Sequence, residues 1–203
     1  LLQGEQKPAT SFTCPGIFGN VGGDPEVGLL YDPEAARQAL AEAGYPDGEG
    51  FPPVVLMLNV SEAHMQIAQA IQAMWKEVLN VDVSIEQQEW KVYLQTLKPD
   101  SPDEDKPHIF RMGWCADYLD ANNWLNDVFH SKSTENYSRF LNEEFDALVE
   151  QAAREQDPDV RLELYKQAEI ILNNEATAIA PIYFYTRVTL NKPYLTRIVN
   201  PLN

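Results

Sequence analysis

Strand-like and helix-like hydrophobic patterns alternate through the middle of the chain. Residues 54–60, VVLMLNV, form a short apolar run that predicts a buried strand. After the capping residue Ser61, apolar side chains recur at helical spacing as far as residue 79. Residues 81–86 then alternate apolar and polar positions, as a strand with one buried face does. Strand, helix and strand in this order predict a parallel pair joined by a right-handed crossover, and therefore an α/β domain.

The same patterns predict further elements on both sides of this unit. Helix starts are marked by Pro33 after the cap residue Asp32, by Glu89, by the cap residue Asn142 and by Pro158, and strand patterns cover 108–114 and about 180–186. We expect both strands to join 54–60 and 81–86 in one mixed sheet flanked by helices.

The stretch 113–120, GWCADYLD, places two aromatics, a cysteine and two acids directly after a predicted strand. Asp117 follows the apolar strand and has Trp114 and Tyr118 as neighbours, so its carboxylate needs either an internal cation or the ammonium of a ligand. Asp120 is better interpreted as a loop acid that caps a turn. The enzymatic alternative uses Asp117 and Asp120 as the acid and base of a hydrolase.

Asparagines and cysteines are the other candidate residues here. Asn122 and Asn123 are interpreted as caps for the helix that follows, a role that asparagine favours. Cys115 and Cys14 are either bridged, as in an exported protein, or free thiols. The residues alone leave both interpretations open.

Composition limits the class of protein. The chain has 203 residues, 44% of them hydrophobic, which is enough to bury a core. Lys and Arg number 15 against 31 Asp and Glu, and the resulting charge of −16 repels nucleic acid. We therefore expect no nucleic-acid partner. No apolar run approaches the roughly 20 residues that a membrane helix needs.

Motifs that hold cofactors or metals are absent from the sequence. It has no Gly-rich phosphate loop and no nucleophile elbow. The histidines His64, His108 and His130 lie far apart without metal-ligand spacing, so we expect neither a cofactor nor a metal site. The chain opens LLQGEQKPAT without an initiator Met, and we expect a mature protein or a fragment.

Several segments together resemble a known family. They are KPATSF, YDPEAARQALAEAGYPDGEGFP, IAQAIQAMWKEVLNVDVSIEQQEWKVYLQTL, MGWCADYLDANNWL and the run from YSRFLNEEFDALV to IAPIYFY. In this order they resemble the C-terminal lobe of the oligopeptide- and dipeptide-binding receptors of ABC importers, family 5 of the extracellular solute-binding proteins.

This resemblance implies a type II periplasmic-binding fold, in which two α/β lobes close on a solute. Residues 1–30 would then lead in from the hinge, 31–190 would form the α/β lobe, and 191–203 would return toward a missing N-terminal lobe. It further implies a receptor that does no catalysis and delivers its solute to a membrane permease. The expected location is periplasmic or extracellular, with a lipid anchor as one option at the missing N-terminus.

The resemblance also assigns roles to the candidate residues. Asp117 would pair with the α-amino group of a bound peptide, Trp114 and Tyr118 would line the wall around it, and Trp90 would lie near the solute. An oligosaccharide is the alternative solute, because relatives with other solutes share the scaffold.

The cysteines depart from the family pattern. In peptide-binding members, the cysteine of the W-C-A-D segment is bridged to a cysteine on an earlier strand, and Cys14 lies later in the chain than that partner. Either the bridge of Cys115 is rewired to Cys14, or its partner lies outside this chain.

Overall fold

The computed structural model describes residues 6–186 and 190–196, which divide into two compact units. In the described ranges, unit 1 is Tyr31–Gly113, and unit 2 combines residues 6–30 with 114–186 and 190–196. The predicted limits of the lobe, 31–190, stay a prediction. The predicted return segment 191–203 lies partly outside the described residues.

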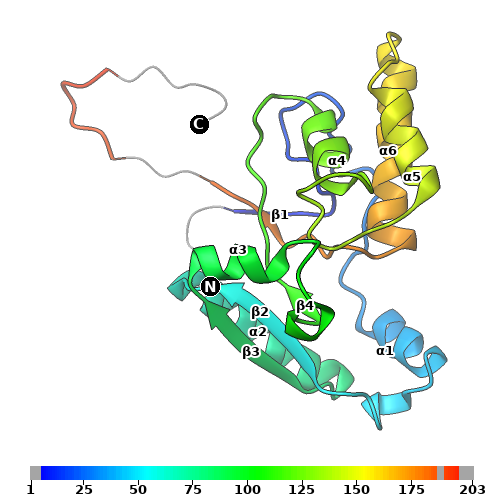
Figure 1. The fold of residues 1–203 in the computed structure, drawn as a ribbon, viewed down its shortest axis with the longest axis vertical. Helices are drawn as coiled ribbons and strands as arrows, with labels where there is room; N and C mark the ends of the chain where they lie inside the picture. Colours follow the sequence, from blue (N-terminus) through cyan, green and yellow to red (C-terminus); the bar gives the residue numbers. More distant parts are fainter. Residues whose placement is uncertain (1–5, 187–189, 197–203) are drawn as a thin grey trace. The chain divides into compact units, whose positions relative to one another are not determined.

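Unit 1 is built on a parallel sheet. β2 (Val54–Asn59) lies between β3 (Val83–Gln88) and β4 (Ile109–Phe110), and both neighbours run parallel to it. The helix α2 (Glu62–Leu79) connects β2 to β3 (Figure 1). The predicted strand–helix–strand order and parallel pairing are confirmed, although β3 begins two residues later than expected and β4 is shorter.

The core of unit 1 follows the predicted hydrophobic pattern. Leu58 of β2 is fully buried, and Val81 and Val83 are 4% and 8% exposed. Trp75 of α2 packs against the same cluster, as its helical spacing predicted. Burying an aliphatic side chain contributes about 1.5–3 kcal/mol, so this cluster fixes the register of β2 on β3.

Local capping signals set the helix starts of unit 1. Asp32 accepts hydrogen bonds from the N–H groups of Glu34 and Ala35 and starts α1. Ser61 accepts one from the N–H of His64 and starts α2. Other elements of this unit are α1 (Pro33–Glu42), η1 (Pro46–Gly48), α3 (Trp90–Leu97) and η2 (Asp103–Asp105).

Unit 2 is mainly helical in its described part. Its helices are α4 (Ala121–Phe129), α5 (Glu143–Ala152) and α6 (Pro158–Ile170), and α6 continues as a π-helical turn, η3 (Ile171–Glu175). α5 and α6 pack against each other (Figure 1). Asn142 caps α5, and Pro158 occupies the first turn of α6, as the sequence predicted.

A second hydrophobic cluster joins the helices of unit 2. Phe145 of α5, Tyr165 of α6 and Leu172 of η3 are fully buried in it. The ring of Phe145 meets that of Phe140 edge-on, with centroids 5.2 Å apart. Aromatic pairs in this geometry add about 0.5–1.5 kcal/mol to the burial of their area.

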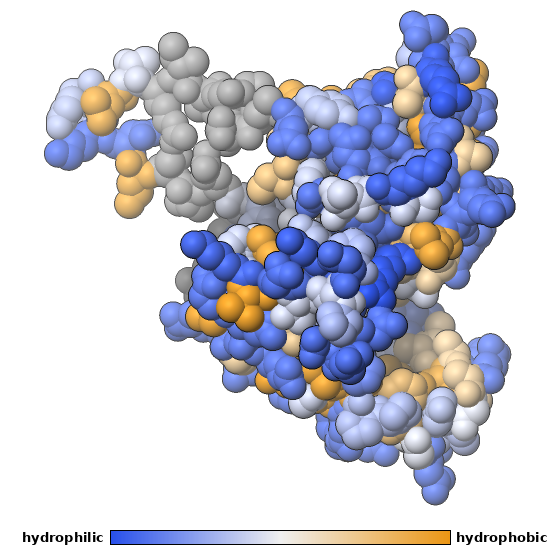
Figure 2. All heavy atoms as spheres, viewed as in Figure 1, coloured by the Kyte–Doolittle hydropathy of each residue, from blue (hydrophilic) through white to orange (hydrophobic). Residues whose placement is uncertain are grey.

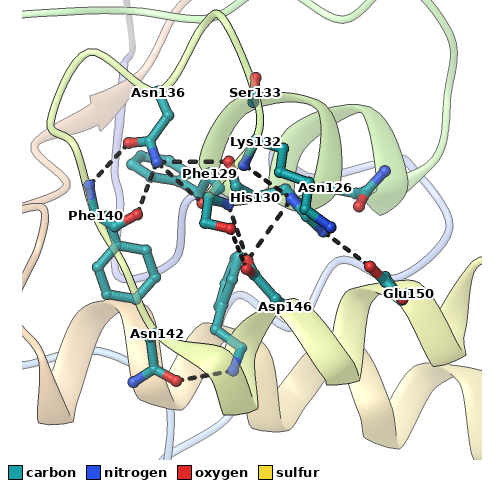
Figure 3. A network of polar contacts seen from close by, with 12 residues as sticks. Asn126, Phe129, His130, Lys132, Ser133, Asn136, Phe140, Asn142, Asp146 and Glu150 are labelled. Atoms are coloured by element: carbon teal, nitrogen blue, oxygen red, sulfur yellow. Dashed lines mark hydrogen bonds and ion pairs between the residues drawn. The ribbon is translucent and has the colours of Figure 1, made fainter. Parts of the chain in front are cut away.

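A polar network holds the loop between α4 and α5 (Figure 3). The Nε2 atom of His130 lies 3.2 Å from a carboxylate oxygen of Glu150, and its Nδ1 atom lies 3.9 Å from Asp146. The amide of Asn136, which is 2% exposed, donates to the carbonyl of Phe140 at 2.8 Å. Because the loop is tied to α5 at several points, α4 and α5 keep a fixed spacing.

The segment before α1, residues 6–30, is called the lead-in segment below. It belongs to unit 2, because α6 and η3 hold it by hydrogen bonds. The buried carboxylate of Glu169 accepts hydrogen bonds from Phe12 N at 3.0 Å and from Thr13 N at 2.8 Å. The hydroxyl of Thr13 and the amide of Asn173 donate to the same carboxylate at 2.7 and 2.6 Å. Farther along, Asn174 accepts a hydrogen bond from the N–H of Gly28.

The C-terminal strand differs from the prediction. β5 (Tyr183–Phe184) pairs antiparallel with β1 (Lys7–Pro8), so it forms a separate ladder in unit 2 and does not join the sheet of unit 1. Parallel and antiparallel pairing both occur, but in two sheets instead of one mixed sheet. The partner strand was missed because its two residues, one of them a proline, carry no strand pattern.

The acidic composition is visible at the surface. Figure 2 shows hydrophilic residues over most of the outer face of α5 and α6. No helix in the described ranges is both long enough and apolar enough to cross a membrane.

Candidate functional site

The candidate site of unit 2 begins at the N-terminus of α4, where Asp120 is the cap residue. Its Oδ1 atom accepts a hydrogen bond from Asn122 N at 2.9 Å, which satisfies one of the free N–H groups of the first turn. Asp120 was predicted to be a capping acid, and this is confirmed. Asn122 and Asn123 were predicted to be caps, and this is wrong, because both lie inside the first turn of the helix.

Arg161 of α6 clamps the same carboxylate. Its guanidinium donates two parallel hydrogen bonds to the oxygens of Asp120, at 2.7 and 2.8 Å, and a third to the hydroxyl of Tyr165 at 2.7 Å. The hydrogen bonds with Asp120 raise the pKa of Arg161. Because both oxygens of Asp120 are occupied, this carboxylate is not free to act as the second acid of a hydrolase.

The lead-in segment closes against the start of α4. Phe18 O accepts a hydrogen bond from Ala121 N at 2.8 Å, and Phe18 forms a parallel bridge with Asp120. Gly19 has a φ of +82°, and a Cβ there would stand 2.5 Å from the Cβ of Ala121. This position therefore requires glycine both for its conformation and for space.

Asp117 is exposed on unit 2, and its charge is not neutralised within the chain as described. In residues 6–186 and 190–196, no Lys, Arg or His forms an ion pair with it. Its carboxylate accepts one long hydrogen bond, 3.4 Å from the amide nitrogen of Asn123. The internal-cation alternative considered from the sequence is therefore not found in the described part, and the carboxylate is available to a ligand cation.

Trp114 and Tyr118 stand on either side of Asp117 in sequence, and both belong to unit 2. The indole of Trp114 is half-buried against the helical core, and its Nε1 atom donates to Asn123 Oδ1 at 3.1 Å. Tyr118 is 40% exposed, and its hydroxyl donates to Asp127 at 2.7 Å. Burial is the largest cause of the raised pKa of Tyr118. Each aromatic side chain is thus fixed at one end by a hydrogen bond and still has accessible surface.

Trp90, the fourth predicted site residue, belongs to unit 1. It opens α3, is 45% exposed, and stacks on Tyr93 with ring centroids 6.0 Å apart and an interplanar angle of 29°. Tyr93 and Leu97 of the same helix are buried, so α3 packs on their side and leaves Trp90 accessible. An aromatic face held by a buried neighbour is a usable contact surface for a ligand.

The two cysteines both belong to unit 2 and are free thiols in this structure. Cys14 is partly buried and Cys115 is exposed. Burial is the main cause that raises the pKa of Cys14, and Cys115 contributes a smaller increase. A bridge between them stays a prediction.

Sequence reasoning missed the residue that organises this site. Asn123 is 2% exposed and contacts Trp114, Asp117 and Asp127. The available signal was its position: with Asp120 as the cap, Asn123 falls one turn into the helix, beside the apolar residues of the buried face. A polar side chain there has to find partners.

Metal ligation has no support in the described ranges, where no group of at least three His, Cys, Asp or Glu side chains is arranged to hold an ion.

Comparison with known proteins gives one matching family model. Residues 1–136 match the middle part of the bacterial extracellular solute-binding proteins, family 5.

Individual relatives point the same way. The chain is 36% identical over 208 residues to the oligopeptide-binding protein OppA of Bacillus subtilis, covering 99% of this chain and 36% of that protein. It is 35% identical over 164 residues to the periplasmic oligopeptide-binding protein OppA of Salmonella typhimurium, covering 80% and 28%. The crystal structure of Haemophilus influenzae OppA in complex with RPPGFSPFR superposes with a TM-score of 0.77 at 28% identity, covering 91% and 36%. The chain thus spans about a third of the length of these relatives.

Proposed function

Because this chain belongs to the bacterial extracellular solute-binding proteins of family 5, we propose that it is part of a receptor that binds peptides between two lobes. The receptor would hand the peptide to an ABC permease without chemical change, in the periplasm or outside the cell. The remaining lobe would come from sequence beyond this chain, which spans about a third of its relatives' length.

The state of Asp117 is the observation that carries the proposal. A carboxylate that is exposed, has no ion pair in the described ranges and accepts one weak hydrogen bond has most of its acceptor capacity left for a ligand. The ammonium group of a peptide offers three donors and the opposite charge. A peptide anchored by this group would be bound whatever its side chains are, which suits a receptor for many sequences.

The aromatic residues support the same solute. Trp114 and Tyr118 present partly exposed rings next to Asp117 in the chain, and pockets for small ligands combine apolar walls with a few polar anchors. The alternative solute, an oligosaccharide, would use stacking on the tryptophans and would not need the charge of Asp117. The two solutes therefore differ in their dependence on this carboxylate.

The test is a calorimetric titration of the full-length receptor with a tripeptide mixture, the same mixture N-acetylated, and cello-oligosaccharides. Asp117→Asn keeps the shape and removes the charge. Losing one partner of a buried charge pair costs about 2–5 kcal/mol, so peptide affinity should fall roughly 30- to several-thousandfold. Acetylation should weaken binding to the wild type by a similar factor and to the variant hardly at all.

Asp159→Asn is the matched control, because Asp159 is an exposed acid of α6 in the same unit. Its peptide affinity should equal that of the wild type. Equal binding of free and acetylated peptides to the wild type would refute the ammonium assignment. If the receptor bound sugars and not peptides, the proposed solute would be an oligosaccharide instead of a peptide. Turnover of either ligand, if Asp117→Asn abolished it, would refute the proposal that the receptor does no catalysis.

A further inference from the structure

A single buried amide connects the aromatic and acidic groups of the site. Asn123 lies in the first turn of α4, three residues after the cap Asp120, and is 2% exposed. A buried side-chain amide is costly unless its donors and acceptors are paired. The hydrogen-bond partners of this amide therefore indicate which groups Asn123 holds in place.

Both ends of the Asn123 amide are used. Its Oδ1 atom accepts hydrogen bonds from Trp114 Nε1 at 3.1 Å and from Asp117 N at 2.9 Å. Its Nδ2 atom donates to Asp117 Oδ2 at 3.4 Å and to Asp127 Oδ2 at 3.0 Å. Two acceptor positions and two N–H groups are the full capacity of a carboxamide.

This arrangement admits one orientation of the amide. If it were flipped, its NH₂ group would face the indole N–H of Trp114 and the backbone N–H of Asp117, and its oxygen would face two carboxylates. The four partners thus define where the amide points, and the amide in turn fixes the loop of residues 114–117 relative to the first turn of α4.

The remaining side chains near Asp117 do not duplicate this role. Asn122 donates to the hydroxyl of Tyr118 at 2.7 Å, and that hydroxyl donates to Asp127. Neither Asn122 nor Tyr118 has a hydrogen bond to Trp114 or to the backbone of Asp117 in the described structure. Asn123 is accordingly the link that holds Trp114 and Asp117 together.

We propose that Asn123 is the positioning residue of the ligand site: its amide aims the carboxylate of Asp117 and the indole of Trp114 at the ammonium group of a bound peptide. This inference rests on the proposed function, because it gives Asn123 an effect on binding only through Asp117 and Trp114, the two groups that it aims at the ammonium. It does not require Asn123 to contact the ligand.

The first test uses Asn123→Ala in the full-length receptor with a free tripeptide and its N-acetylated form. Groups in direct contact couple strongly enough to change affinity by about tenfold, so the free peptide should bind about tenfold more weakly. The acetylated peptide, which cannot use Asp117, should bind within about twofold of its wild-type affinity. The factor by which acetylation weakens peptide binding should therefore be about tenfold smaller in Asn123→Ala than in the wild type. A purely structural role would weaken both peptides equally.

The second test uses Asn123→Asp, which keeps an acceptor for Trp114 and Asp117 N but replaces the donor with a third carboxylate. Nearby like charges raise the pKa of an acid, and ammonium binding needs the ionised form. On acidification, affinity should therefore be lost about one pH unit higher than in the wild type. Asn142→Asp is the matched control, since Asp serves as well as Asn at the N-cap that Asn142 provides for α5. Its pH profile should not move.

These outcomes separate the two proposals. If acetylation does not weaken binding to the wild type, the ammonium assignment itself fails. If acetylation matters in the wild type, but Asn123→Ala keeps the full penalty and Asn123→Asp keeps the wild-type pH profile, the positioning role is overturned. Should Asn123→Ala not fold, the pH profile of Asn123→Asp decides the matter.

Discussion

The clamp between Arg161 and Asp120 should be a main source of stability in unit 2. Arg161→Ala removes two hydrogen bonds to Asp120, one to Tyr165 and one from Nε to Ala152 O at 2.8 Å. It also removes the stacking of the guanidinium over the ring of Phe18, 4.9 Å from its centroid. Breaking a buried ion pair costs about 3–5 kcal/mol. The two side chains are 21% and 22% exposed, so water replaces part of the loss, and we expect about 2–4 kcal/mol.

Urea unfolding of the full-length protein, followed by circular dichroism, measures this loss. Arg154→Ala is the matched control, because Arg154 is 78% exposed and its hydrogen bond to Glu150 is 3.4 Å long. Its cost should be below about 1 kcal/mol. Asp120→Asn keeps a capping residue and removes the charge, so in that background Arg161→Ala should cost clearly less. Equal costs for Arg161→Ala and Arg154→Ala, or additive effects of Arg161→Ala and Asp120→Asn, would refute the reasoning.

Three further expectations concern other parts of the two units. Oxidised glutathione should bridge Cys14 and Cys115, so that the number of thiols titrated in the unfolded protein falls from two to none. Two remaining thiols would exclude a bridge. In the control variant Cys14→Ser, the thiol of Cys115 should stay reactive. Burial raises the pKa of Glu169 above its ordinary 4.5, so stability should fall as the pH rises from about 4.5 through the raised folded pKa, because the folded state holds the proton more tightly there. Glu169→Gln should flatten that part of the stability profile, and an unchanged profile would assign the pH dependence elsewhere. Phe145→Ala should lower the free energy of unfolding, measured in urea, by about 3–5 kcal/mol. Leu141 is 74% exposed, so Leu141→Ala should change the same quantity by less than about 0.5 kcal/mol. Similar values for both variants would mean that Phe145 is not part of the core.

Local signals in the sequence predict the elements well and their long-range partners poorly. Asp32, Ser61 and Asn142 start helices as predicted, because an N-cap depends on a few neighbouring residues. The pairing of β5 with β1 depends on residues about 175 positions apart in the chain, as in the pair Lys7 and Phe184. No periodic pattern encodes such a contact, so the C-terminal strand was assigned to the wrong sheet.

The candidate site shows the same division. The composition of GWCADYLD singled out Asp117 as a candidate, because a carboxylate after an apolar strand and beside aromatics needs a partner. The roles of Trp114 and Tyr118 followed from the family resemblance, and all three assignments stay predictions. The partner of Asp120 was not predictable, since Arg161 lies 41 residues away on another helix. Asn123 was misinterpreted because asparagine is common at caps, and its buried role depends on which residue takes the cap position.

The hold of α6 on the lead-in segment has a consequence for biosynthesis. Residues 31–113 of unit 1 are continuous in sequence, whereas Thr13 has to wait for Glu169, 156 residues later. At about 5–20 residues per second, this delay is roughly 8–30 s. During that time Phe12 and Thr13 lack the carboxylate that holds their N–H groups in the finished fold. The nascent chain therefore cannot fix this part of the segment before α6 has been made, and until then the segment is accessible to chaperones.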